Sequence, residues 1–407
     1  MLKEKIRQLA KQYAPETIEI RRHLHAHPEL SYKEFQTSAF VQEKLKGLGI
    51  PFEIKATTGV VGMIQGKNPD KRIIALRADM DALPVTERTP VPFASKVKTM
   101  YNGQEVGVMH ACGHDAHTSI LLGASKILHE LKSEWEGTVK LIFQPGEEKN
   151  PGGASLLVKE GVLHNPRPQA IFGLHVHPGL EIGKFSFRGG PSMASADEIY
   201  ITVRGKGGHA STPQLTVDTI LVASHIVVAL QQVISRNKNP FSPSVLSISS
   251  FQGGFTTNVI PSEVKLMGTF RSMEETWRFQ AHKLIHRICK GIGQAMGAEI
   301  EVLVDVGYPV VNNDEKLYPV ARKRAEEFAG IENVQETEIR MGSEDFGYYT
   351  QEIPGCFYRI GVMNESKGIT SGVHTPTFNI DESAIEKGMG MMAWLGVSIY
   401  ETNNLPQ

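Results

Sequence analysis

The sequence predicts an α/β fold with a second, smaller domain inserted into it, and three observations carry this prediction. Short apolar runs at residues 72–76, 139–143 and 170–176 have the length and composition of buried strands. The hydrophobic pattern changes to a more regular alternation near residue 190 and changes back near residue 305. A chain of 407 residues is also too long for one ordinary hydrophobic core, so we expect two domains.

The first domain is predicted from the order of its elements. A helical repeat, in which Ile120, Ala124, Ile127 and Leu131 share one face, lies between the first two strands. Strand–helix–strand order is typical of a layered α/β fold. A charged, periodic helix begins the chain, and a strand at 356–362 and a helix after Asp381 return to the same domain.

The inserted domain is predicted from a β-α-β-β-α-β order, which is the ferredoxin-like order. Its expected elements are a strand at 198–205, a helix at about 218–234, strands at 244–251 and 263–270, a helix at about 275–296 and a strand at 298–306. We therefore predict a discontinuous first domain, residues 1–189 and 306–407, and an inserted domain, residues 190–305.

Composition limits the partners and the compartment. Lys and Arg number 43 against 44 Asp and Glu, which favours neither a nucleic acid nor an anionic membrane as partner. The three cysteines are far apart, so we expect no disulfide framework and a reducing compartment. The N-terminus has no apolar signal region, and the most apolar stretch, 220–230, is short of the ~20 residues that span a bilayer. We predict a cytoplasmic protein.

Residues 109–117, MHACGHDAH, contain one of these cysteines within a cluster of histidines. Cys112 and His114 precede the predicted helix, and a thiolate and an imidazole two residues apart can reach one metal ion. The partial positive charge of a helix N-terminus is expected to lower the pKa of the thiol. A buried cysteine beside surface histidines is the alternative, and the motif alone does not decide between them.

Further polar residues follow the predicted strands, where sites of α/β sheets collect. RADMDALPV (77–85) contains two aspartates that could bind a metal or orient a histidine, although a solvated strand end is the favoured interpretation of this stretch taken alone. FQPGEE (143–148) follows the second strand, GLHVHP (173–178) ends the third, and HTPTFNIDE (374–382) comes later.

Five of these residues together suggest a metal centre: Cys112, His114, Glu148, His175 and His374. Five ligands exceed the four of one tetrahedral Zn²⁺. They suit a pair of metal ions ~3.5–4 Å apart, with Cys112 as a thiolate ligand and bridge.

Eight motifs in order resemble the metallopeptidase family of aminoacylases, hippurate hydrolases and auxin–amino-acid conjugate hydrolases. They are RADMDALPV, HACGHDAH, FQPGEE, GLHVHP, GKGGHAS, NVIP, MGSEDFGYY and HTPTFNIDE, and the resemblance runs from about His23 to Glu382. The resemblance implies a zinc-exopeptidase-like catalytic domain with an inserted lid and dimerisation domain, a homodimer, and two divalent metal ions per chain (Zn, Mn or Co).

The resemblance also implies roles for individual residues. The implied metal ligands are Cys112, His114, Glu148, His175 and His374. Glu147 falls on the general base, and Asp81 on the aspartate that orients a ligand. His209 falls on the lid histidine that helps to bind the substrate or its oxyanion, and Asn258 and Arg271 fall in segments that contact a substrate carboxylate.

The implied reaction is metal-dependent hydrolysis of the amide bond of small N-acyl-L-amino acids, with N-acetyl, N-benzoyl or indoleacetyl groups as examples. A water between the metals is the implied nucleophile. A dipeptidase or carboxypeptidase of the same family is the alternative, and a non-catalytic metal-binding protein is a weaker one because Glu147 is present. This chain reads HASTPQLTVDT where relatives often read HASxPHxxxDP. Gln214 and Thr219 therefore bear on the lid contacts and on substrate choice, and not on the metal site.

Overall fold

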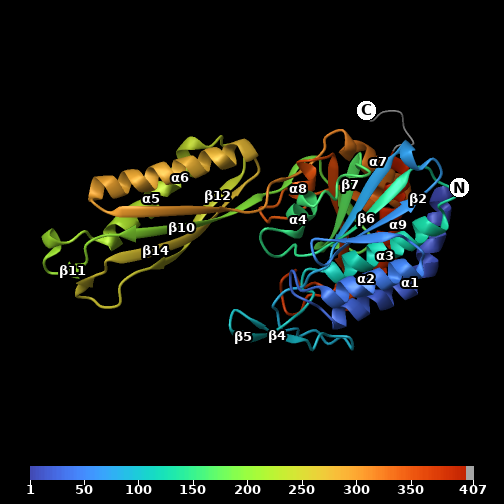
Figure 1. The fold of residues 1–407 in the computed structure, drawn as a ribbon, viewed down its shortest axis with the longest axis horizontal. Helices are drawn as coiled ribbons and strands as arrows, with labels where there is room; N and C mark the ends of the chain where they lie inside the picture. Colours follow the sequence, from blue (N-terminus) through green and yellow to red (C-terminus); the bar gives the residue numbers. More distant parts are fainter. Residues whose placement is uncertain (400–407) are drawn as a thin grey trace. The chain divides into compact units, whose positions relative to one another are not determined.

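The computed structural model describes residues 1–399. They divide into two compact units, each described by itself. The first unit contains Met1–Gly190, Asn312–Glu338 and the chain from Asp345 onward, and the second contains Pro191–Val311 and Ile339–Glu344. The chain passes between them at β9 (Gly190–Met193), at β16 (Val311–Asn313) and again on either side of Ile339–Glu344. Figure 1 follows this course, and the predicted α/β fold class is confirmed.

The first unit is built on an eight-stranded sheet of order β1-β2-β6-β3-β7-β18-β8-β17. The strands β6, β3, β7 and β18 are parallel neighbours, so their carboxyl ends meet at one edge of the sheet. Every residue of β6 is buried, as expected for a parallel strand covered on both faces. The strands are β1 (Phe52–Lys55), β2 (Gly59–Gln65), β3 (Ile73–Asp79), β6 (Thr138–Gln144), β7 (Ala170–Glu181), β8 (Phe185–Phe187), β17 (Val334–Glu336) and β18 (Gly355–Met363).

Three helices of this unit, α1, α3 and α9, pack against one another, and α3 and α9 also pack against β3. Gly123 permits their close approach, because a Cβ there would lie 2.5 Å from Met389 Sδ and 3.1 Å from the Thr17 side chain. Figure 1 shows α1, α2 and α3 together on one side of the sheet. The helices are α1 (Leu2–Ala26), α2 (Phe35–Gly47), α3 (His114–Glu130), α4 (Gly153–Lys159), α7 (Leu317–Ala329), α8 (Gly347–Thr350) and α9 (Ser383–Ser398).

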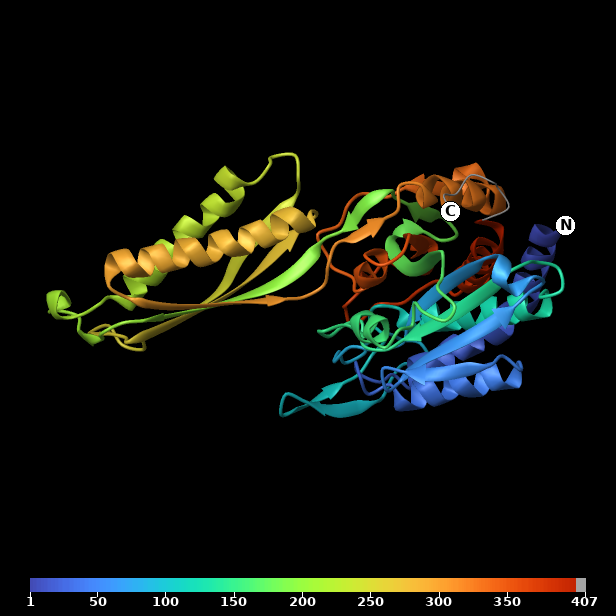
Figure 2. The ribbon, with the colours of Figure 1, turned by 45° about the horizontal axis from the view of Figure 1, so that its top comes forward.

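A β-hairpin that the sequence analysis did not predict belongs to the same unit. Strands β4 (Lys98–Tyr101) and β5 (Gln104–Gly107) form a two-stranded sheet of their own. They are joined at Asn102-Gly103, whose φ angles of 50° and 79° are those of a type I′ turn. Figures 1 and 2 show the hairpin standing away from the rest of its unit.

The second unit has a four-stranded antiparallel sheet of order β12-β14-β10-β15, and its β-α-β-β-α-β sequence of main elements is the predicted one. Both helices pack on one face of this sheet, as Figure 2 shows, and enclose a core that includes Ile199, Ile226 and Ile285. The elements are β10 (Ser195–Arg204), α5 (Thr219–Asn237), β12 (Ser244–Gln252), β14 (Glu263–Ser272), α6 (Glu275–Met296) and β15 (Glu299–Val306), with the short strands β11 (Gly208–His209) and β13 (Val259–Ile260).

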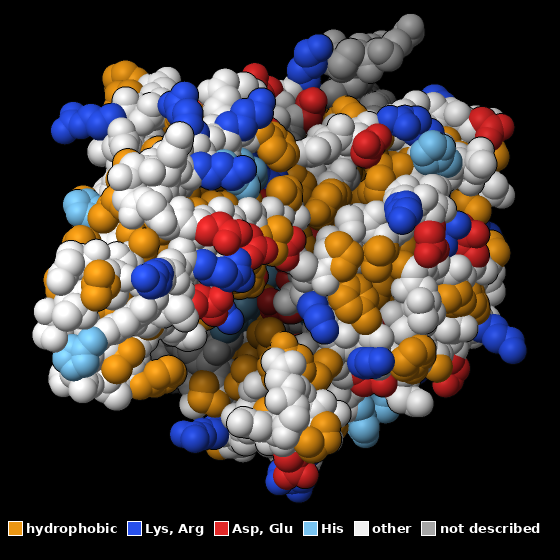
Figure 3. Space-filling view, turned by 60° about the vertical axis from the view of Figure 1, so that its left-hand side comes forward, with side chains coloured by type: hydrophobic (Ala, Val, Ile, Leu, Met, Phe, Trp, Pro, Cys, Tyr) orange, Lys and Arg blue, Asp and Glu red, His pale blue; other side chains and the backbone are white. Residues whose placement is uncertain are grey.

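Helix α5 is longer than the apolar stretch expected from the sequence. Its 19 residues make it the one helix within residues 1–399 that is long and apolar enough to cross a membrane. Val222, Ile226, Leu230 and Val233 lie in the core of the second unit, so packing against the sheet accounts for much of its hydropathy. On the face shown in Figure 3, basic and acidic side chains are interspersed.

Candidate metal centre

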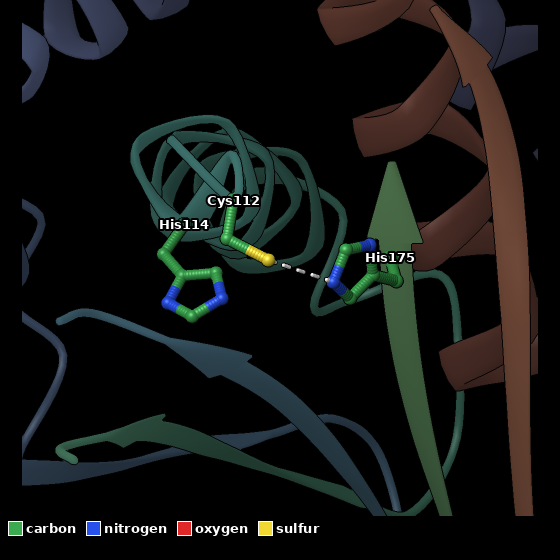
Figure 4. Close-up of side chains that lie close together, drawn as sticks. All are labelled: Cys112, His114 and His175. Carbon is green, nitrogen blue, oxygen red and sulfur yellow. Dashed lines mark hydrogen bonds between the residues drawn. The ribbon is translucent and has the colours of Figure 1, made fainter. Parts of the chain in front are cut away.

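The segment that leads into α3 brings Cys112 and His114 to β7. Cys112 Sγ lies 3.4 Å from Nε2 of His175, and Figure 4 shows the thiol of Cys112 directed at that ring. Donor atoms of the three residues all lie within 4.8 Å of one another. Gly113 makes the turn possible, because its φ is +91° and a Cβ would lie 2.5 Å from Val176 Cγ2.

Glu148 and His374 complete the cluster from two other segments. Glu148 follows β6, and its Oε1 lies 3.1 Å from Nε2 of His374. His374 precedes α9 in the chain and is tethered by its backbone N–H, which donates to the carbonyl of Ala111 at 2.7 Å. Cys112, Glu148 and His374 form a second group of donors within 4.8 Å, and His114, Glu147 and Glu148 form a third. The structure thus brings all five predicted ligands and Glu147 together.

One donor atom in this cluster is left open for a cation. His114 Nε2 is buried and has no hydrogen-bond partner within residues 1–399. Buried polar atoms are rarely left without a partner. Thiol, imidazole and carboxylate groups are the usual ligands of Zn²⁺ and related ions. The residues present therefore suit divalent metal ions.

Asp81 orients two members of the cluster. His114 Nδ1 lies 2.9 Å from the Asp81 carbonyl and 3.2 Å from Oδ1, which leaves Nε2 to face the other donors. Asp81 Oδ2 accepts from the backbone N–H of Glu148 at 2.9 Å and from Ser31 Oγ at 2.6 Å. The interpretation of this stretch as a solvated strand end is wrong, because Asp79 and Asp81 are 0% and 1% exposed.

His117, the third histidine of the motif, is held in another way. The backbone N–H of Val176 donates to His117 Nε2 at 2.9 Å, so the ring proton lies on Nδ1. That Nδ1 donates to Asp79 Oδ1 at 2.6 Å, and Asp79 also accepts from Arg77 at 2.6 Å. Both nitrogens of His117 are therefore occupied, and the ring ties the end of β3 to β7.

The charges of the cluster overturn the expected effect of the helix N-terminus on Cys112. Burial and the nearby carboxylates of Glu148 and Glu147 raise the pKa of the thiol well above its ordinary value. Burial lowers the pKa of His114, but Asp79 and Asp81 outweigh it and raise that pKa to about 10. Without a cation, both groups carry a proton at neutral pH.

A segment missed by the sequence analysis, residues 31–34, supports the turn that carries Glu147 and Glu148. The buried carboxylate of Glu34 accepts from the backbone N–H of Gly146 and from Thr58 Oγ1, both at 2.8 Å. The hydroxyl of Tyr32 donates to the carbonyl of Lys149 at 2.6 Å. Glu34 lies in a stretch rich in lysine and glutamate, so no pattern distinguishes it from a surface residue.

The three remaining predicted residues belong to the second unit. His209 is exposed in β11. Asn258 lies close to it, because the carbonyl of Asn258 accepts from the N–H of Ala210, the next residue after His209, at 3.0 Å. Both lie beyond the end of the sheet where Arg204 pairs with Glu263. Arg271 lies toward the other end of β14 and donates to Ser343 Oγ at 3.0 Å. From residue 263 to residue 271 the strand spans roughly 27 Å. Arg271 is therefore too far from His209 and Asn258 for the three to contact one substrate within this unit.

Comparisons with known proteins agree with this geometry. Residues 75–395 match the peptidase family M20/M25/M40. The N-acyl-L-amino acid amidohydrolase of Geobacillus stearothermophilus is 42% identical over 317 residues, which cover 77% of this chain and 83% of that protein. Thermostable carboxypeptidase 2 of Saccharolobus solfataricus is 40% identical over 402 residues, covering 97% and 98%. Among solved structures, a dinuclear metal-binding peptidase of the M20 family from Bacillus subtilis is 34% identical, with a TM-score of 0.80 and coverage of 96% and 99%.

Proposed function

The chain belongs to the peptidase family M20/M25/M40, and on that premise we propose that it hydrolyses the amide bond of N-acyl-L-amino acids with the help of two divalent metal ions. The observation that carries the proposal is the convergence of Cys112, His114, Glu148, His175 and His374 beside a buried glutamate, Glu147. One relative is a named amidohydrolase, and a related structure is described as dinuclear.

In this proposal the five converging residues hold the metals, and Glu147 moves the proton. Bound divalent ions would supply a water of lowered pKa and polarise the substrate carbonyl. Glu147 is 6% exposed, takes the proton from the attacking water and later delivers it to the leaving amine. Asp81 keeps His114 in the orientation that presents Nε2.

A pair of adjacent substitutions tests these roles. Glu147→Gln should retain the metal and lose turnover by ~10²–10⁴-fold, the usual contribution of general-base catalysis. Glu148→Gln should lose metal as well as activity. If both variants kept their metal and only Glu148→Gln were inactive, the two roles would be reversed.

Metal content tests the cofactor directly. Elemental analysis of protein supplied with Zn²⁺, Mn²⁺ or Co²⁺ should approach two ions per chain, and the ion that gives the highest turnover identifies the preferred metal. Cys112→Ala should lower metal content and activity together. An active protein that is unaffected by strong chelators and holds no metal would refute the proposal.

A carboxypeptidase of the same family is the second candidate, favoured by the similarity to thermostable carboxypeptidase 2. A panel of N-acetyl, N-benzoyl and indoleacetyl amino acids assayed beside dipeptides separates the two, because the better class shows the higher kcat/KM. A protein that binds metal and turns over neither class would be a non-catalytic binder, which the presence of Glu147 argues against.

We also propose that two copies associate through the second unit. Strand β12 is an edge of its sheet, and Val245 and Phe251 on it are 38% and 44% exposed. On α5, Leu221 and Val228 are 49% and 72% exposed. An unprotected edge strand beside exposed apolar side chains is suited to pairing with a second chain. Val228→Glu should shift the protein to a monomer in sedimentation experiments.

In such a dimer we propose that His209 serves the active site of the partner. Within the second unit, His209 lies at the end of the sheet opposite to the residues that connect to the first unit. Glu147→Gln and His209→Ala, each nearly inactive, should restore activity when mixed as a heterodimer if His209 acts in trans. Inactive mixtures with demonstrated heterodimers would exclude that model.

The three cysteines support the proposed cytoplasmic location. Cys112, Cys289 and Cys356 are all buried and unpaired. Proteins without disulfides are typical of reducing compartments. Cell fractionation tests this location.

A further inference from the structure

A pocket of about 560 Å³ adjoins the metal centre, and Glu148 belongs to both. It lies wholly within the first unit, and four segments build it: residues 28–33, residues 82–84, the β4–β5 hairpin with its flanks, and residues 148–149. Its volume falls within the ~300–1,000 Å³ that is usual for small-molecule sites. The roles proposed above leave this pocket unused.

The walls of the pocket combine apolar and polar residues. The apolar part of the wall includes Leu30, Leu83, Pro84, Val97 and Val108. Two of its segments are fixed by backbone hydrogen bonds, since the N–H of Ala82 donates to the carbonyl of Glu29 at 2.8 Å and Leu83 exchanges two 3.0 Å bonds with Met109. This part of the pocket is therefore preformed.

The charged groups that line the pocket do not give it a buried anchor for an ion. Glu29 is already engaged, because its carboxylate accepts from the backbone N–H groups of Gln36 and Thr37 at 3.1 and 2.8 Å. Lys98 is exposed and pairs with Glu105 at 3.0 Å. Lys33 and Lys149 are exposed as well, so their ammonium groups can remain in water while their stems contact a ligand.

One wall of the pocket is the β4–β5 hairpin. Thr99 and Tyr101 line the pocket and are half-buried. A two-stranded hairpin has little stability of its own, and this one joins no other sheet. The next pair toward the body, Val97 and Val108, is hydrogen-bonded at 3.0 Å. The base of the hairpin is therefore held independently of its two strands. The hairpin can thus be altered without disturbing the eight-stranded sheet.

We propose that this pocket binds the acyl group of the substrate, and that the β4–β5 hairpin favours large apolar acyl groups such as benzoyl or hexanoyl. The inference rests on the proposed amidohydrolase function. The carbon under attack is the acyl carbon, which must come within reach of Glu147 and Glu148, so the group attached to it lies next to the pocket. The amino-acid part carries an α-carboxylate, for which the pocket offers no buried cation, because its three lysines are exposed.

The experiment compares N-acetyl, N-hexanoyl and N-benzoyl derivatives of one amino acid, measured as kcat/KM on the metal-loaded protein. Each methylene buried in an apolar pocket is worth about fourfold, so the four extra methylenes of hexanoyl favour it over acetyl by up to about 250-fold. Thr99→Trp fills the pocket and should lower the hexanoyl-to-acetyl ratio at least tenfold. Replacing Lys98–Gly107 with Asn-Gly removes the wall and should lower the same ratio.

A matched control lies on the same hairpin. Glu105 is exposed and does not line the pocket, although its cross-strand partner Met100 does. Glu105→Trp therefore adds the same bulk and should leave the ratio unchanged. If it lowered the ratio as much as Thr99→Trp does, the effect would not come from the pocket and the proposal would fail.

Equilibrium binding separates this inference from the proposed function. Calorimetry should show that the metal-loaded protein binds hexanoate more tightly than acetate, and that Thr99→Trp removes the difference with unchanged metal content. Equal binding of the two acids would overturn the acyl pocket even in an active amidohydrolase. Selective hexanoate binding in a protein that hydrolyses no N-acyl amino acid would refute the proposed function and retain the pocket.

Discussion

Loading the metal-free protein with Zn²⁺ at pH 7 should release at least two protons per chain, because at least two ligands, Cys112 and His114, must lose a proton to bind. The pKa of His114 is raised to about 10 and the pKa of Cys112 is raised well above its ordinary value. Both groups are therefore protonated at pH 7 before the metal binds. His114 uses Nδ1 toward Asp81, so the proton that leaves comes from Nε2.

Two substitutions divide this number between its sources. Cys112→Ser removes the thiol and should lower the release by about one proton. Asp81→Asn removes one of the carboxylates that raise the pKa of His114, so that pKa should fall. The pH above which His114 no longer releases a proton on metal binding should therefore be lower than in the unaltered protein. A ligand with a raised pKa holds its proton in the metal-free protein, and the metal must displace that proton. The affinity for metal therefore rises with pH until the pH exceeds that raised pKa.

Titration calorimetry in buffers of different ionisation enthalpy measures the release, because the observed enthalpy changes linearly with that of the buffer and the slope counts the protons. Cys289→Ser is the control, since Cys289 is buried in the core of the second unit and should leave the slope unchanged. A slope near zero for the unaltered protein, or an equal slope for Cys112→Ser, would refute the assignment.

Three stability predictions concern other buried features and can be checked by denaturant unfolding. Gly113→Ala should cost about 1–3 kcal/mol and reduce metal content, because the new Cβ would lie 2.5 Å from Val176 Cγ2 at a φ of +91°. Lys140→Met should cost about 2–4 kcal/mol, since Nζ donates to three backbone carbonyls at 2.8–2.9 Å; equal stability would contradict this. Burial raises the pKa of Asp381, but hydrogen bonds, including one from Lys367, outweigh this effect and lower that pKa to about 2. Asp381→Asn should therefore cost about 1–2 kcal/mol at pH 7. That difference should be present above about pH 4 and vanish as the pH falls through 2, and a difference that persisted at pH 2 would contradict it.

Much of the fold could be predicted because the signals are local. The strands β3, β6 and β7 contain short apolar runs. The predicted runs 139–143 and 170–176 fall within observed strands, and the run 72–76 begins one residue before β3. The β4–β5 hairpin was missed because its residues are largely polar and exposed, and only the Asn102-Gly103 pair marks it. An Asn-Gly pair is a recognised hairpin signal, so the β4–β5 hairpin was predictable from this pair.

The candidate site was only partly predictable. Motifs identified the five converging donors, but the burial of Asp79 and Asp81 was not visible in a stretch that also fits a solvated strand end. The pKa of Cys112 was expected to fall and instead rises, because carboxylates from other segments surround the thiol. The support from Glu34 depends on a contact with Gly146, which is 112 residues away in the chain.

The sequence by itself predicted most of the main elements, the change of pattern at the second unit and the candidate metal ligands, because hydrophobic periodicity and ordered motifs are local features of the chain. Only the tertiary structure decided which nitrogen of His114 faces the cluster, that His117 is tied to Asp79 and Val176, and that a pocket opens beside Glu148. The physical reason is that hydrogen-bond partners, burial and local charge come from segments that are distant in sequence. They exist only once the parallel strands bring their carboxyl ends to one edge of the sheet.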